Sequence, residues 1–170
     1  MKPCIEPLTI RPPVDTDIEA MRTLLNEIIR VGGTTAMTNE LAPEEMREWF
    51  ISGNAVVSCL VAVDSDGAIA GFQSLSTYGS LPAGWVDIAT FTSRSRHKSG
   101  VGSALFVHTR EVASALGFSA INASIRVHNV GGLAYYSRMG FETYLNEAGD
   151  PQDHGRAFNR VHKRFDVAQN

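Results

Sequence analysis

The sequence predicts an α/β fold, in which helices flank a mixed, mostly antiparallel central sheet. Two apolar runs, residues 55–63 and 68–77, are joined by the turn sequence Asp64-Ser65-Asp66-Gly67, which indicates a β-hairpin. From residue 85 to residue 141, strand-like and helix-like segments alternate, which indicates helical crossovers between parallel strands. No repeat or low-complexity linker interrupts the 170 residues, so we expect one domain over residues 1–170.

The N-terminal part is expected to form a short strand at residues 8–11 and then two helices. Asp15 or Asp17 can cap the first helix, and Gly32-Gly33 ends it. Pro43 stands at a helix-start position and opens the second helix, which is short. The apolar residues of the first helix recur with helical spacing, at Ile18, Met21, Leu24, Leu25, Ile28 and Ile29.

The C-terminal part is expected to alternate strands at residues 85–91 and 118–125 with two helices. The first of these helices follows Gly100 and ends near Leu116, and the second ends at Gly140, before a strand that starts at Phe141. Residues 158–165 form a last strand, with the charged Lys163 and Arg164 near a sheet edge. In the helix that follows Gly100, residues at helical spacing predict a buried stripe, formed by Val101, Leu105, His108, Val112 and Leu116.

Composition excludes several classes of function. A formal net charge of −3 argues against a general nucleic-acid binder. Two cysteines, Cys4 and Cys59, cannot build a disulfide framework, and no His/Cys cluster has the spacing of a metal site. Residues 1–6 lack the apolar region of a secretory signal, and the longest apolar run, residues 55–63, is too short to span a bilayer. We therefore expect a cytoplasmic protein without a metal, a nucleic-acid partner or a membrane partner.

Two glycines, Gly100 and Gly102, stand where a buried strand passes into a helix. Free N–H groups at a helix N-terminus favour an anion, and glycine lets the backbone approach it closely. Arg94, Arg96 and Lys98 add positive charge to this turn. The sequence is neither the dinucleotide fingerprint nor the nucleotide P-loop, so it predicts a phosphate cradle of another kind, with helix capping as the structural alternative.

Two segments together resemble motifs A and B of the GNAT acetyltransferase superfamily. The first is His97-Lys98-Ser99-Gly100-Val101-Gly102, with His97 where glutamine or arginine is usual. The second takes its motif positions at Asn129, Gly132, Tyr135, Tyr136, Arg138, Gly140 and Phe141. The resemblance covers roughly residues 8–165, and within the superfamily it is greatest to the phosphinothricin acetyltransferase group.

This resemblance implies that the fourth and fifth strands splay apart and admit acetyl-CoA as a cosubstrate. The strand end Thr90-Phe91-Thr92 would bind the pantetheine arm, and Asn129 would reach the same arm or cap the following helix. The pyrophosphate would lie on the turn formed by His97, Lys98, Ser99, Gly100, Val101, Gly102 and Ser103.

Two side chains are candidates for acid–base chemistry. Asp87 is the only acid in the apolar strand 85–91, and the resemblance places it where the phosphinothricin group has a catalytic base. The structural alternative is an aspartate bonded to loop amides. Tyr136 matches a tyrosine that protonates the CoA thiolate in GNAT enzymes, with core packing as its alternative. Neighbouring Tyr135 is expected to pack.

The leading functional hypothesis is an N-acetyltransferase for a small, amino-acid-like amine, in a homodimer that the resemblance implies. The acceptor pocket is expected to be lined by the first two helices, the loop between them at residues 31–40, and loop 78–84. Alternatives are acetylation of a protein N-terminus or a polyamine, or a non-catalytic acyl-CoA sensor. Of the remaining histidines, His154 and His162 are expected at the surface, and the position of His128 is left open.

Overall fold

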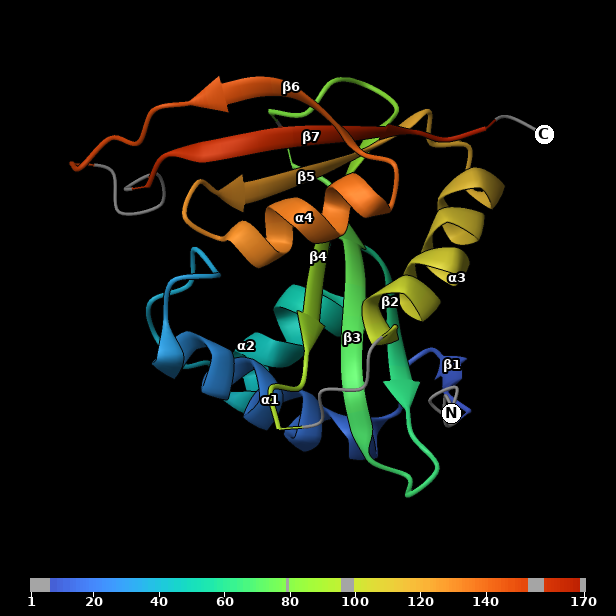
Figure 1. The fold of residues 1–170 in the computed structure, drawn as a ribbon. Coiled ribbons are helices and arrows are strands. Elements are labelled where there is room, and N and C mark those ends of the chain that lie inside the picture. Colours follow the sequence, from blue (N-terminus) through green and yellow to red (C-terminus); the bar gives the residue numbers. More distant parts are fainter. Residues whose placement is uncertain (1–6, 79, 96–99, 153–157, 169–170) are drawn as a thin grey trace, which may run out of the picture.

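The chain folds around one seven-stranded sheet with helices on both faces (Figure 1). The computed structural model describes residues 7–78, 80–95, 100–152 and 158–168. The strand order is β1-β2-β3-β4-β5-β7-β6. In chain order the elements are β1 (Thr9–Arg11), η1 (Asp15–Asp17), α1 (Ile18–Val31), α2 (Pro43–Arg47), η2 (Glu48–Ser52), β2 (Val56–Val63), β3 (Ile69–Ser76), β4 (Trp85–Thr92), α3 (Val101–Ala115), β5 (Ala120–Arg126), α4 (Val130–Arg138), β6 (Glu142–Glu147) and β7 (Arg160–Asp166).

Strands β4 and β5 are parallel neighbours, and every other neighbouring pair in the sheet is antiparallel. They pair only over their first residues, Trp85–Asp87 with Ala120–Asn122, although they run on to Thr92 and Arg126. Beyond Asp87 the two strands diverge, which separates the β1–β4 part of the sheet from the β5–β7 part (Figure 1). The predicted fold class, including the splayed fourth and fifth strands, is confirmed.

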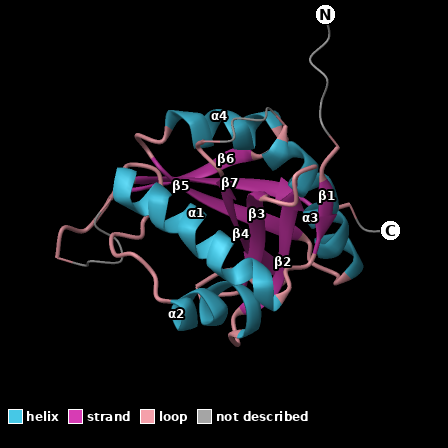
Figure 2. Cartoon of the chain, turned by 90° about the horizontal axis from the view of Figure 1, so that it is seen from below, coloured by secondary structure: helices cyan, strands magenta, loops and turns pink. Residues whose placement is uncertain are grey.

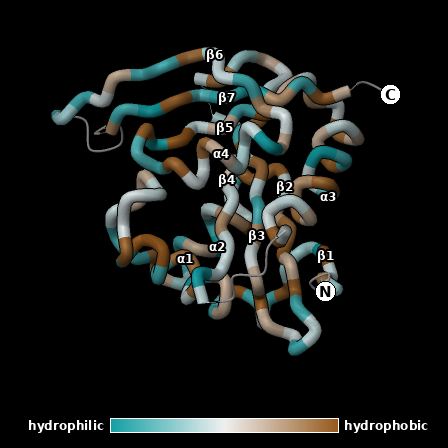
Figure 3. The backbone as a smooth tube through the Cα atoms, in the orientation of Figure 1, coloured by the Kyte–Doolittle hydropathy of each residue, from teal (hydrophilic) through white to brown (hydrophobic). Residues whose placement is uncertain are grey.

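Alternation along the central strands assigns each helix to a face of the sheet. On β2, Cys59 and Val61 pack with α1 and α2, whereas Leu60 and Ala62 pack with α3. Helix α4 packs beside α3 over β4 and β5, where Tyr136 joins the core. Figure 2 shows the helices on both sides of the sheet, and Figure 3 shows hydrophobic residues gathered in α1 and the central strands.

The loop between α1 and α2 is anchored by a buried side chain. Asn26 on α1 is only 3% exposed, and its Oδ1 accepts the Leu41 N–H at 2.8 Å while its Nδ2 donates to the Leu41 carbonyl at 3.1 Å. Asn26 thus satisfies the Leu41 N–H, which would otherwise be costly to bury, and shares the Leu41 carbonyl with Arg22, whose Nη1 donates to it at 3.3 Å. This anchor fixes the end of a loop whose earlier residues reach the functional cleft.

Two expectations about the outer elements are wrong. Strand β7 lies between β5 and β6, so Lys163 is buried rather than near an edge, and its Nζ donates to Thr143 Oγ1 at 3.0 Å. His108 is half-exposed and lies 3.8 Å from Glu111, because the buried face of α3 is rotated toward Phe106 and Thr109. Across the described ranges, the helices lack the length and apolar character needed to cross a membrane.

We expect Asn26→Ala to lower the free energy of unfolding by about 1–3 kcal/mol, because it leaves the buried Leu41 N–H without its partner, whereas the Leu41 carbonyl keeps the bond from Arg22. Urea unfolding at constant pH measures this difference. Thr23→Ala, an exposed change on the same helix, is the matched control. Equal stability of the two variants would contradict the assigned anchor.

Candidate active site

The divergence of β4 and β5 opens two adjoining cavities. The first, of about 600 Å³, is lined by side chains of β4, β5, β6 and β7, and we call it the sheet cavity. The second, of about 580 Å³, lies against the start of α3 and the first turns of α4, and we call it the turn cavity. The residues common to both are Thr34, Thr35, Thr90, Phe91, Asn129 and Tyr136. Reactants in the two cavities would therefore meet at a common wall.

The turn cavity has the properties of an anion site. Gly100 adopts φ +99°, a conformation that L side chains rarely take, and directly precedes α3. The Ala104 N–H donates to the Gly100 carbonyl at 2.8 Å, and α3 begins at Val101. The N–H groups of the first turn of a helix have no acceptor within the helix itself and are therefore available to an anion. Arg94 and Arg138 also line this cavity. The predicted site residues His97, Lys98 and Ser99 lie outside the described residues.

Gly102 is required for the packing of α4 on the start of α3. A Cβ atom on Gly102 would lie 2.8 Å from Cε2 of Tyr135, and the Tyr135 hydroxyl donates to the Gly102 carbonyl at 2.7 Å. The expected packing role of Tyr135 is confirmed, and its hydroxyl adds a bond that the sequence does not reveal.

Asn129 caps α4, as one of its two expected roles requires. Its Oδ1 accepts the Gly132 N–H at 2.9 Å, and its Nδ2 donates to the Thr34 carbonyl at 3.2 Å. The second bond ties loop 31–40 to α4 across the opening between the two parts of the sheet. Asn129 also lines both cavities, whereas the neighbouring His128 is exposed.

Asp87 lies on β4 at the last residue that pairs with β5, and it lines the sheet cavity. Its Oδ1 accepts the Asn122 Nδ2 hydrogen at 2.6 Å, and Asn122 Oδ1 in turn accepts the Tyr144 hydroxyl at 2.6 Å. Desolvation raises the pKa of Asp87 to about 7, although the bond from Asn122 and the charge of Arg160 act in the opposite direction. A carboxyl with such a pKa can take up and release a proton near neutrality.

Tyr136 forms part of the wall between the cavities and is 7% exposed. Its hydroxyl lies 2.8 Å from Thr90 Oγ1, and its ring packs edge-on against Phe141. Burial raises the pKa of Tyr136 well above that of a free phenol, and the bond with Thr90 partly offsets this rise. The structure thus brings the two predicted acid–base residues, Asp87 and Tyr136, to the same cleft.

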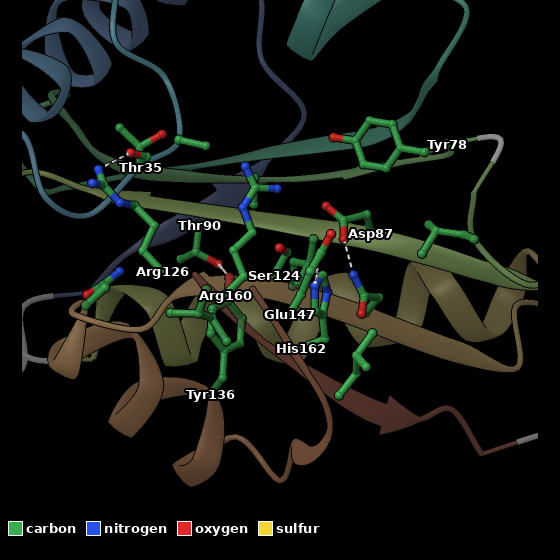
Figure 4. Close-up of a pocket in the computed structure, with 18 of the residues that line it drawn as sticks. Thr35, Tyr78, Asp87, Thr90, Ser124, Arg126, Tyr136, Glu147, Arg160 and His162 are labelled. Atoms are coloured by element: carbon green, nitrogen blue, oxygen red, sulfur yellow. Dashed lines mark hydrogen bonds and ion pairs between the residues drawn. The ribbon is translucent and has the colours of Figure 1, made fainter. Parts of the chain in front are cut away.

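Sequence reasoning missed most of the charged side chains of the sheet cavity. Figure 4 shows Arg126 of β5 and Arg160 of β7 extending into this space. The Arg126 guanidinium donates to the Thr35 carbonyl at 2.9 Å and stacks 3.5 Å from the centre of the Phe158 ring. The sequence pattern that could have revealed these cavity residues is the alternation of side chains along each strand. Residues 122, 124 and 126 lie on one face of the sheet, and residues 160 and 162 likewise share a face.

His162 lines the sheet cavity, so the expectation of a surface position is wrong. Its Nε2 lies 2.7 Å from Glu147 Oε2, and the two side chains are 14% and 32% exposed. The predicted acceptor loops are present in the same cavity, through residues 34–37 and 80–82. Within the ranges that the structure describes, no group of three or more His, Cys, Asp or Glu residues could hold a metal ion.

Comparison with known proteins identifies relatives over most of the chain. The sequence model of the acetyltransferase (GNAT) family matches residues 18–141. YwnH of Bacillus subtilis (strain 168), provisionally named a phosphinothricin acetyltransferase, is 29% identical over 136 residues, which are 79% of this chain and 83% of YwnH. The phosphinothricin N-acetyltransferase of Streptomyces coelicolor is 27% identical over 164 residues, which are 94% of this chain and 92% of that protein.

A solved structure supports the same fold. The GNAT superfamily phosphinothricin acetyltransferase from Sinorhizobium meliloti, in complex with acetyl-CoA, superposes with a TM-score of 0.81 at 24% identity. The superposition covers 95% of this chain and 89% of that chain. At this level of identity the likeness establishes the fold alone.

We expect the Asp87 carboxyl to make the protein less stable as pH rises. The unfolded carboxyl has a pKa of about 4, and the folded one a pKa of about 7. Between these values the folded state keeps a proton that the unfolded state has lost, so the free energy of unfolding falls as pH rises. Asp87→Asn removes this dependence. As pH rises between these two pKa values, the free energy of unfolding of the variant should therefore increase relative to that of the parent, by about 1–2 kcal/mol in total. This is less than the full shift implies, because Asp87 is partly exposed.

Urea unfolding of parent and variant at about pH 4.5, 6 and 8 measures the effect. Glu142→Gln, which removes an exposed carboxyl on β6, is the control. A stability difference between Asp87→Asn and the parent that does not change with pH would contradict a raised pKa for Asp87.

Proposed function

Since this chain belongs to the acetyltransferase (GNAT) family, we propose that it transfers the acetyl group of acetyl-CoA to the amine of a small, amino-acid-like acceptor. One observation carries the proposal. The two cavities adjoin at Tyr136, and Asp87 lines the one that lies away from the helix N-terminus. A phosphate-bearing donor and an amine acceptor can thus approach a common wall from two sides.

The turn cavity suits the acetyl-CoA side of this reaction. The N–H groups at the start of α3 and the guanidinium groups of Arg94 and Arg138 would bind the pyrophosphate. The strand end Thr90–Thr92 lies beyond the last β4–β5 pair, so its backbone groups that face the cleft are free of β5 and would bind the pantetheine arm. Asn129 would contact the same arm while it caps α4.

Asp87 would act as the general base in the sheet cavity. The acceptor amine is mostly protonated near neutrality, and it needs a free lone pair to attack the thioester carbon. Asp87 would take this proton, directly or through one water. A new C–N bond then forms, the C–S bond breaks, and the electron pair of that bond stays on sulfur. Tyr136 would give a proton to the departing thiolate. The second proton that the nitrogen loses as the amide forms would pass to solvent, from which the Tyr136 hydroxyl is restored.

Charge in the sheet cavity favours an acidic or zwitterionic acceptor over the alternatives. Asp87 and Glu147 also line this cavity and would attract the amine of any acceptor. Acceptors are distinguished by Arg126 and Arg160, whose guanidinium groups would repel the additional amino groups of a polyamine. They would instead attract a carboxylate on the acceptor, as an amino acid carries. A protein N-terminus lacks a free carboxylate beside its amine and would gain less from these arginines. A non-catalytic sensor would not need a positioned general base, and so would not need the hydrogen bonds that join Asp87, Asn122 and Tyr144.

We expect Asp87→Asn and Tyr136→Phe to lower turnover by at least about tenfold, since general acid–base steps contribute about 10²–10⁴-fold. Their pH dependences should differ. In the parent, the Asp87 carboxyl is itself mostly protonated well below its pKa of about 7 and cannot then act as a base. The loss in Asp87→Asn should therefore be greatest where the carboxylate is present and the amine is still protonated, and it should shrink at higher pH as free amine becomes abundant. Tyr136→Phe keeps the ring, so the affinity for acetyl-CoA should change little.

Release of free thiol from acetyl-CoA, measured across a panel of amino acids, polyamines and peptides, tests both the function and the residues. A parent protein that binds acetyl-CoA but acetylates no amine would favour the sensor. Brisk acetylation by the parent and by both variants would keep the enzyme and remove both assigned roles.

A homodimer and a cytoplasmic location belong to the same proposal, through the resemblance to the phosphinothricin group. We expect light scattering at micromolar concentration to give about twice the mass of one chain, 18.4 kDa. The mass of a single chain under these conditions would refute the dimer without affecting the proposed chemistry.

A further inference from the structure

A buried chain of hydrogen bonds leads from β3 to the wall between the two cavities. It starts at Gln73, which is 1% exposed. The Gln73 amide nitrogen donates to Thr90 Oγ1 at 2.8 Å and to the Tyr135 hydroxyl at 3.2 Å. Thr90 Oγ1 lies 2.8 Å from the Tyr136 hydroxyl, and Tyr135 donates to the Gly102 carbonyl at 2.7 Å. Gln73 is therefore the common donor of two branches.

Counting hydrogens fixes the direction of the Tyr135 branch. The single hydroxyl hydrogen of Tyr135 is used by the Gly102 carbonyl, because a carbonyl can only accept. The Gln73 atom that faces the Tyr135 oxygen must then be a donor, so it is the amide nitrogen and not Oε1. With this orientation Oε1 is left without a partner in the described residues. The sheet thus keeps a buried acceptor unsatisfied in order to present both N–H groups to the site.

The same orientation acts on Thr90. Its oxygen accepts from Gln73, and its own hydrogen remains available for the Tyr136 oxygen 2.8 Å away. If Thr90 donates, the hydroxyl hydrogen of Tyr136 is left to point away from Thr90, toward the cavities that Tyr136 lines. Donation from Gln73 polarises the Thr90 O–H bond and strengthens this arrangement.

We infer that Gln73 is a positioning residue for acetyl transfer, which makes Thr90 a hydrogen-bond donor to Tyr136 and so directs the Tyr136 proton to the departing thiolate. This inference rests on the proposed function, because it assumes that Tyr136 is the acid. As Tyr136 gives up its proton, the Thr90 hydroxyl continues to donate a hydrogen bond to the phenolate oxygen and stabilises the negative charge that develops there.

The need for such a donor follows from the surroundings of Tyr136. Burial strongly opposes the phenolate, and the charged or titratable groups that face Tyr136, Asp87 on β4 and Tyr135 on its own helix, oppose it further. The edge-packed ring of Phe141 offers no donor. In the part of the chain that the structure describes, the Thr90 hydroxyl is the group within hydrogen-bond distance of the Tyr136 oxygen.

Three single variants separate the two branches. Thr90→Val cuts only the branch to Tyr136, Tyr135→Phe cuts only the branch to Gly102, and Gln73→Met cuts both while keeping a side chain of similar length. We expect kcat to fall about tenfold in Gln73→Met and in Thr90→Val, since a hydrogen bond to a charged group contributes about 1.5–3 kcal/mol. Thr90→Ser, which restores the hydroxyl, should recover most of kcat. Tyr135→Phe should act mainly on KM for acetyl-CoA.

The double variant Gln73→Met/Thr90→Val gives the decisive comparison. If both residues act through one bond to Tyr136, the double variant should lose no more kcat than Thr90→Val alone. Additive losses, or an unchanged kcat in folded Gln73→Met, would overturn the inference. Should Gln73→Met fail to fold, Gln73→Glu replaces it. A protonated glutamate can donate to Thr90 and a carboxylate cannot, so its kcat relative to the parent should fall as pH rises, and a constant ratio would refute the role.

The Tyr136→Phe variant separates this inference from the proposed function. A slow Tyr136→Phe beside a fully active Gln73→Met would remove the role of Gln73 alone. A parent with no acetyl transfer to any amine would remove the proposed function, and the inference with it.

Discussion

The short pairing between β4 and β5 is the constraint on which the rest of the structure depends. Parallel pairing stops after Asp87 and Asn122, and the strands then leave backbone groups and side chains facing each other across open space. Buried backbone groups need partners, so this opening is stable only if its ends are supported or its groups face a ligand. Asn122 supports the last paired position, Asn129 ties loop 31–40 to α4, and Arg126 holds the Thr35 carbonyl.

The two titratable groups of the cleft, Asp87 and Tyr136, both differ from free side chains, for different structural reasons. Asp87 lies where the pairing of β4 and β5 ends and is only partly exposed, and desolvation raises its pKa to about 7. Tyr136 packs into the core formed by α3, α4 and β5, where burial raises its pKa further. The opening thus creates the cavities and the surroundings of Asp87, whereas core packing determines the surroundings of Tyr136.

Much of the fold followed from the sequence because its signals are local. The hairpin turn at residues 64–67, the stripe of α1 and the glycine start of α3 each specify an element without reference to the rest of the chain. The position of β7 between β5 and β6 is a matter of topology, and no local pattern around Lys163 encodes it. His108 was misplaced for a related reason, since rotation of α3 is set by what it packs against.

The candidate site divides along the same line. Asp87, Tyr136 and the glycine turn were found through motifs whose members are close in sequence, and the structure brings them to one cleft. Arg126, Arg160 and the Glu147–His162 pair come from three different strands, and they share a cavity only after β7 is inserted. The role of Gln73 could not be predicted for another reason. A glutamine in an apolar strand belongs to no motif, and its role follows only from its hydrogen-bond partners in the structure.

The wall between the cavities has a further thermodynamic consequence. Thr34, Thr35 and Asn129 border both cavities, and they belong to parts of the chain that lie on opposite sides of the opening between β4 and β5. Occupancy of either cavity would restrict the same residues and thereby lower the ordering entropy that the second reactant must overcome. Linkage then requires the effect to be mutual, so each reactant would tighten the binding of the other by the same factor. Such a cleft would favour a ternary complex, in which both reactants are bound at the same time, over a ping-pong order in which one leaves before the other binds.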